Sequence, residues 1–236
     1  MGLIQPPDRP CSLNSLEQAI NDKITVSLTD NQFVPIPNFY KLDKQPIQYL
    51  DILIYTALKS FDNDDKDCFP KHETIAKRAG MSKRFVINSI KRLEAGEFLT
   101  VLRSDKKRTS NHYSFKKYDH FEMIPFDLLS QQDLTPNEKA ILIGLRQFFI
   151  HGPLQCMDDI SFFAKWLGLT YNTISPLYMS LVEKGYIKET QKIYKGKGSG
   201  KVLKTLTDKV SWDQMTNVKS ILNQTSSTIY PILKVA

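Results

Sequence analysis

The chain has 236 residues, of which 41% are hydrophobic and 24% are charged. This balance excludes a chain that is disordered throughout, and the length allows one large domain or two small ones. The formal net charge of +7 favours a polyanionic partner, with nucleic acid ahead of an anionic membrane surface.

The sequence carries no signal for a membrane or for an oxidising compartment. No apolar run approaches the roughly 18 residues needed to span a bilayer, and the segment from Met1 to Ser15 has no apolar signal-peptide core. Cys11, Cys68 and Cys156 fit neither a disulfide framework nor a Cys-x-x-Cys metal site. We therefore expect a cytoplasmic protein with no membrane partner, in which Cys68 and Cys156 act as small apolar residues.

The first predicted elements are an extended segment and two helices. Phe33 to Phe39 is punctuated by prolines and is expected to be extended. Apolar residues recur at helical spacing from Ile47 to Phe61, and an acidic loop, Asp62 to Asp67, ends that helix. The loop lacks the closing glutamate of a calcium site, so we interpret it as solvated. After Pro70, the stretch Lys71 to Ala79 is predicted to be a short helix.

A third helix and a hairpin complete this unit. Gly80 is expected to end the short helix in a left-handed conformation, and Ser82 is expected to cap a helix from Lys83 to Ala95. Two strand-like segments, Phe98 to Arg103 and Asn111 to Phe115, flank a polar basic tip. The predicted order is helix, short helix, turn, longer helix and hairpin.

The same order recurs in the second half of the chain. Thr135 to Glu138 forms a capping box with proline at the first helical position, and it opens a helix that ends at Phe149. The elements that follow are a short helix at Asp158 to Leu167, a third helix at Tyr171 to Glu183, and strands at Tyr186 to Lys192 and Lys201 to Leu206.

An internal repeat relates the two halves. An ungapped offset of 88 residues places Phe33 on Phe121, and core, turn and cap positions continue to match along the register. We interpret this as two copies of one small domain. The predicted boundaries are an N-terminal arm at 1–31, a first domain at 32–118, a second domain at 119–206 and a tail at 207–236, with a tail helix from Ser211 to Leu222.

The segment from His72 to Arg84 resembles the helix-turn-helix family that is common in plasmid and phage replication proteins and in bacterial regulators. The family shows a short Ala-Lys-Arg helix, a turn glycine, an apolar residue, a serine, and then the basic start of the recognition helix. It often closes its wing with an Asn-x-Tyr pair, as Asn111 and Tyr113 do here. The resemblance implies a mainly α protein with small β-hairpin wings (α+β), built from two tandem winged helix-turn-helix domains.

A recognition helix presents hydrogen-bond donors on the face opposite its core contacts. With Val86 pointing inward and about 100° of turn per residue, Arg84, Asn88 and Lys91 point outward. Arginine suits guanine and asparagine suits adenine, and the basic tip suits phosphate. The predicted DNA contacts of the first unit are Ser82, Lys83, Arg84, Asn88, Lys91, Arg92, Lys106, Lys107, Arg108 and Asn111.

The second unit has diverged on the same face, where Asn172, Pro176 and Met179 replace the basic set. Pro176 implies either a kinked helix or a helix that is capped by Ser175 and has Pro176 as its first residue. This unit either grips phosphate through its wing or has turned to protein contact. Its predicted DNA contacts are Thr170, Tyr171, Asn172, Thr173, Lys192, Lys195, Lys197 and Lys201.

These features favour a binding protein over an enzyme. The histidines are scattered, and the glycine-rich tip around Lys195 lacks the ending of a phosphate-binding loop, so we expect no catalytic residue, no metal and no cofactor. The preferred hypothesis is a replication initiator of a plasmid, phage or other mobile element. It would bind double-stranded DNA at origin repeats, recruit host replication proteins and could act as a homodimer. The alternatives are a transcription regulator on an operator and a protein-interaction module.

Overall fold

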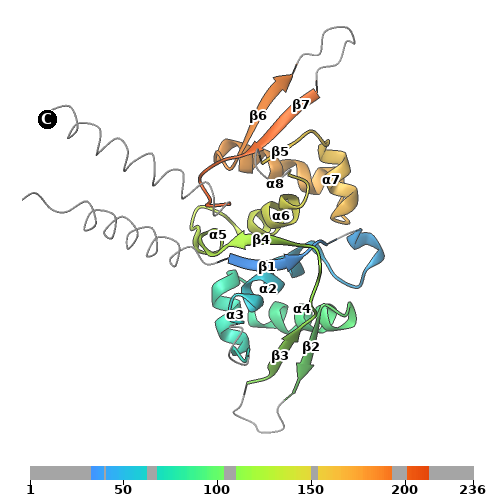
Figure 1. Cartoon of the computed structure of the whole chain (residues 1–236), viewed down its shortest axis with the longest axis vertical. Coiled ribbons are helices and arrows are strands. Elements are labelled where there is room, and N and C mark those ends of the chain that lie inside the picture. Colours follow the sequence, from blue (N-terminus) through green and yellow to red (C-terminus); the bar gives the residue numbers. More distant parts are fainter. Residues whose placement is uncertain are drawn as a thin grey trace, which may run out of the picture. The chain divides into compact units, whose positions relative to one another are not determined.

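The computed structural model describes residues 33–39, 41–62, 68–103, 110–149, 154–192 and 201–212 (Figure 1). These residues belong to one compact unit, Phe33–Trp212. The predicted N-terminal arm, the tail helix, the acidic loop after Asp62 and both hairpin tips lie outside the described residues.

Two short strands join the halves of the chain. Strand β1 (Phe33–Pro37) pairs antiparallel with β4 (Phe121–Pro125), and the central pair of the register is Pro35 with Met123. Because a proline lacks the N–H that a ladder needs, such a segment suits an edge position, which both strands of a two-stranded sheet occupy. The extended segment was predicted, but its pairing with its own repeat counterpart was not.

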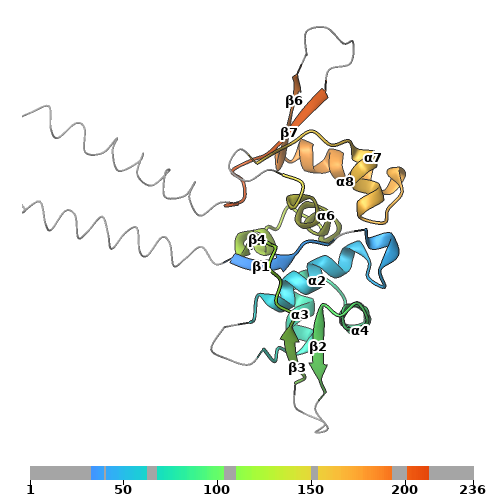
Figure 2. The same cartoon turned by 45° about the vertical axis from the view of Figure 1, so that its right-hand side comes forward.

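Two buried helices form the centre of the unit. Helices α2 (Tyr49–Lys59) and α6 (Pro136–Arg146) pack against each other, on opposite sides of the β1–β4 pair in both views (Figure 2). Both helices are apolar around most of their circumference, which is the pattern of a helix surrounded by protein. The predicted capping box at the start of α6 is confirmed: the Thr135 side chain accepts from the Glu138 N–H, and the Glu138 carboxylate accepts from the Thr135 N–H.

In the first half, α3 (His72–Ala79) and α4 (Lys83–Ala95) follow a short 3-10 turn and α2. The predicted turn is confirmed, because Gly80 has a φ of 67° and the Ser82 hydroxyl accepts from the backbone N–H of the third residue of α4. An antiparallel hairpin, β2 (Leu99–Leu102) with β3 (His112–Phe115), completes the half.

The second half repeats this order, with one helix that the sequence did not predict. That helix is α5 (Phe126–Ser130), which directly follows β4. The remaining elements are α7 (Ile160–Trp166), α8 (Tyr171–Glu183), and the three-stranded sheet of β5 (Gln155–Cys156), β7 (Lys201–Leu206) and β6 (Ile187–Lys192).

Pro176 lies inside α8, and Thr170 caps that helix by accepting from the Thr173 N–H. The alternative in which Ser175 caps the helix and Pro176 is its first residue is therefore wrong. A proline removes one hydrogen bond of the helical ladder, and contacts of α8 with α6 and α7 support the helix on either side of it.

The α+β class is confirmed by helices and small antiparallel sheets. The predicted domains at 32–118 and 119–206 describe two repeats, but the buried apolar residues of both repeats form a single hydrophobic core. Cys68 and Cys156 are buried in this core as expected, and burial raises the pKa of their thiols to about 12 and about 11.

Candidate nucleic-acid interface

The exposed face of α4 carries the predicted reading residues. Val86 and Leu93 are buried on the inner side of the helix, whereas Arg84, Asn88 and Lys91 are exposed on the outer side. No hydrogen bond or ion pair engages these three side chains within the described part of the chain. They are therefore available to a ligand, and their donors match the acceptors that guanine, adenine and phosphate present.

The N-terminus of α4 presents two more of the predicted residues. The Ser82 hydroxyl accepts the Phe85 N–H at 3.2 Å, so its proton remains available to a phosphate oxygen. The Lys83 ammonium pairs with Glu73 of α3, and both side chains are more than half exposed. An exposed pair of this kind contributes little stability, so Lys83 can exchange Glu73 for a phosphate at low cost.

Arg92, another of the predicted contacts, forms an ion pair inside the protein. Its Nε and Nη2 donate to the two carboxylate oxygens of Asp51 at 2.7 and 2.6 Å, and Asp51 is fully buried at the start of α2. The hydrogen bond to Asp51 raises the pKa of Arg92. Because this forked pair neutralises a buried carboxylate, Arg92 holds α4 against α2, and Asp51 engages its Nε and Nη2.

The hairpin of the first half is described only at its base. Lys106, Lys107 and Arg108 lie outside the described residues, and Asn111 is half-buried just before β3. Arg103, which the sequence reasoning missed, is exposed at the end of β2 and forms a forked ion pair with Glu94 of α4. Arg103 comes directly after a strand that leads to a basic tip, and this position is the signal that could have marked it as a candidate contact.

The equivalent face of α8 has little charge. Tyr171, Asn172, Thr173, Pro176 and Met179 are exposed along it. The hydroxyls of the capping Thr170 and of Thr173 lie 2.8 Å apart. This face offers an amide and hydroxyls beside a large apolar surface, in contrast with the cations of α4.

The second hairpin retains basic residues, but the structure places few of their side chains. Lys195 and Lys197 lie outside the described residues, and Lys192 and Lys201 are placed only as backbone at the ends of β6 and β7. Lys204 is buried, and its ammonium donates to the carbonyl of Asp158. Lys204 is therefore a structural residue.

One comparison with known proteins matches the first half of the chain. A family model described as a helix-turn-helix domain matches residues 49–99, which contain α2, α3 and α4. No curated protein and no solved structure matches the chain. A helix-turn-helix domain suggests DNA binding.

The described residues offer neither a membrane span nor a metal site. No helix in this part of the chain is long and apolar enough to cross a membrane. Within the same ranges, no cluster of three or more histidine, cysteine, aspartate or glutamate side chains could hold a metal ion.

Proposed function

We propose that the protein binds double-stranded DNA in a sequence-specific manner, with α4 in the major groove and the β2–β3 hairpin as a wing on the backbone. The observation that supports this proposal is that Arg84, Asn88 and Lys91 lie on the exposed face of a helix within the matched helix-turn-helix domain, without a partner among the described residues. Arg84 and Asn88 can form paired hydrogen bonds with base edges. The protein acts as a binding protein and not as an enzyme.

The second repeat supports a tandem winged-helix arrangement with unequal roles. Its elements follow the same order at an offset of 88 residues, and its hairpin carries lysines that can reach phosphate. The exposed Tyr171, Pro176 and Met179 of α8 offer no cation to DNA. This apolar face favours a second function for the repeat, namely contact with a protein, which includes a second copy of the chain.

Replication initiation at an origin of a plasmid, phage or other mobile element is the biological role that we propose. It rests on the resemblance of the segment from His72 to Arg84 to the helix-turn-helix family that is common in plasmid and phage replication proteins and in bacterial regulators. The neighbouring DNA distinguishes this role from repression. Direct repeats beside an AT-rich stretch favour initiation, whereas a single palindrome over a promoter favours a regulator.

The test begins with selection of a preferred duplex from a random pool by the full chain. Arg84→Ala and Asn88→Ala are then expected to reduce the preference for that duplex over a scrambled one by about 1–3 kcal/mol each. The matched control is Lys44→Ala, which removes a charge from an exposed residue outside α4 and the hairpin. It should leave the preference unchanged.

Salt dependence provides the second readout. Lysine and arginine contacts release counterions from DNA, so the logarithm of affinity should fall linearly with the logarithm of salt concentration. A flat plot would remove the electrostatic contacts from the proposal. A preference that survives both α4 substitutions would exclude α4 as the reading element.

A further inference from the structure

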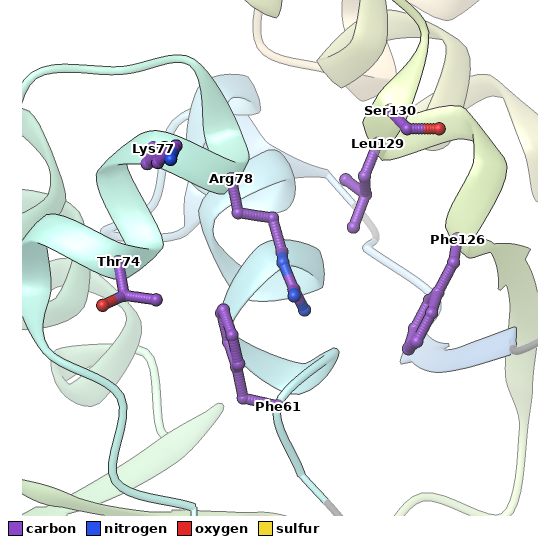
Figure 3. A pocket seen from close by; sticks show the side chains of 7 residues that line it. All are labelled: Phe61, Thr74, Lys77, Arg78, Phe126, Leu129 and Ser130. Atoms are coloured by element: carbon purple, nitrogen blue, oxygen red, sulfur yellow. The ribbon is translucent and has the colours of Figure 1, made fainter.

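A groove lies between α3 of the first repeat and α5 of the second (Figure 3). Its cavity of about 530 Å³ falls in the range of about 300–1,000 Å³ that is typical of ligand sites. The described lining contains no acidic residue. It consists of Phe61, Thr74, Lys77, Arg78, Phe126, Leu129 and Ser130.

Arg78 supplies an incompletely satisfied cation to this groove. Its guanidinium lies 3.7 Å from the centre of the Phe61 ring, and its Nη1 donates to the hydroxyl and the carbonyl of Ser60 at 2.6 and 3.3 Å. No carboxylate among the described residues pairs with it, and burial lowers its pKa. Since a guanidinium has five donors, Nε and Nη2 remain available to an anion, and the exposed Lys77 is a second cation in the lining of the groove.

The opposite side of the groove is apolar. Figure 3 shows Phe126 and Leu129 of α5 across the groove from Phe61 and Arg78. A side chain inserted between them would contact two phenyl rings and a leucine, which stabilise an aromatic or aliphatic group by burial. A DNA backbone has no such group, so these apolar residues favour a polypeptide over a phosphate.

The second repeat provides an internal comparison, because its equivalent positions carry bulky side chains. Phe162 and Trp166 stand where Thr74 and Arg78 stand in the first repeat. Their rings pack against each other at 5.8 Å, and Lys41, the counterpart of Leu129, lies over the Trp166 ring at 6.0 Å. The small threonine, and an arginine that no carboxylate of the described residues pairs with, are therefore particular to the groove in the first repeat.

We infer that the groove between α3 and α5 is a docking site for an acidic segment of another protein. A carboxylate of that segment would bind Arg78 and Lys77, and a neighbouring aromatic or aliphatic side chain would enter between Phe61, Phe126 and Leu129. The groove is open to solvent, so a side chain can enter it while the rest of the segment stays outside. This inference goes beyond DNA binding and does not depend on it.

The test uses the full chain and a short fluorescein-labelled peptide that alternates aspartate with phenylalanine and leucine. Fluorescence anisotropy should show saturable binding, and Arg78→Gln should weaken it by about tenfold, as loss of one charged hydrogen bond typically does. A second test variant is Lys77→Gln, and its matched control is Lys165→Gln. Both lysines are exposed at equivalent repeat positions, but only Lys77 lines the groove, so only Lys77→Gln should weaken binding.

A second variant tests the shape of the groove. The double substitution Thr74→Phe and Arg78→Trp copies the residues of the second repeat into the first, and it should abolish peptide binding while the chain stays folded. A peptide with asparagine in place of aspartate should bind at least about tenfold more weakly.

Three results would overturn the inference. The first is failure of the labelled peptide to bind the wild-type chain. The second is binding of free phenylacetate in the groove without binding of the peptide. The third is a loss of affinity for the selected duplex in Arg78→Gln as large as in Arg84→Ala, which would make Arg78 a phosphate contact. DNA binding is measured on the same samples. Peptide binding without DNA binding would remove only the proposed function, and DNA binding without peptide binding would remove only this inference.

Discussion

The hydroxyl of Tyr49 donates a 2.8 Å hydrogen bond to Oδ1 of Asn137, and these two residues are repeat counterparts, 88 positions apart. Pro35 likewise faces its own counterpart, Met123, at the centre of the β1–β4 pair. Contacts between equivalent positions are the mark of two copies related by a twofold axis. The two repeats therefore pack as the subunits of a symmetric dimer do, within one chain.

We predict that both repeats unfold in a single transition, because α2 and α6 share one core. Leu93→Ala in the first repeat should lower stability by about 2–5 kcal/mol, and the fluorescence of Trp166 in the second repeat should report the same shift as circular dichroism. The fragments 33–118 and 119–212 should not fold alone, since each would expose its buried central helix. Two separate transitions in denaturant would show that the repeats are independent domains.

Arg92 and Arg84 should give opposite results when each is replaced. Arg92→Ala leaves the buried Asp51 carboxylate without its partner and should cost about 3–5 kcal/mol of stability. Arg84→Ala removes an exposed side chain and should change stability by less than about 0.5 kcal/mol, while it lowers DNA preference. Urea denaturation and duplex binding at a temperature where both variants are folded separate the two effects. A stable Arg92→Ala that loses DNA preference would return Arg92 to the reading set.

Glu138 makes stability depend on pH. Burial alone would raise its pKa, but hydrogen bonds from Lys184, Ser180 and Thr135 outweigh burial and hold the pKa at about 2, below the ordinary value of 4.5. A depressed pKa contributes stability that is present above pH 4.5 and is lost as the pH falls through 2. At about 1.4 kcal/mol per pKa unit, this contribution is about 3 kcal/mol.

Glu138→Gln, which keeps the shape of the side chain, is the check on this contribution. The variant should be less stable at neutral pH, and its unfolding free energy should fall less between pH 5 and pH 2 than that of the wild type. Parallel pH curves for the two proteins would contradict the assignment.

The recognition helices should respond unequally to the same truncation. Lys91 of α4 and Met179 of α8 are repeat counterparts, and both are exposed. Lys91→Ala should weaken binding to the selected duplex by about 1–3 kcal/mol, since it removes a charged donor. Met179→Ala should change it by less than about 0.5 kcal/mol. A larger loss from Met179→Ala would show that α8 reads the DNA.

The sequence by itself determined the local structure and one face of the site. Apolar spacing predicted α2, α4, α6 and α8, because a helix that packs on a core must repeat its apolar residues at the helical period. Gly80 and Ser82 predicted the turn, since a left-handed residue and a side-chain cap are local requirements. The direction of Val86 then fixed the exposure of Arg84, Asn88 and Lys91 as a matter of helical geometry.

Only the tertiary structure decided which residues meet across the chain. Arg92 lies on the edge of the outer face of α4, but its partner Asp51 is 41 positions away, and no periodicity of α4 reveals that pair. The pairing of β1 with β4 and the single core depend on how two repeats bury each other's apolar surface. The groove arises in the same way, because Arg78 and Phe126 become neighbours only when α3 packs beside α5.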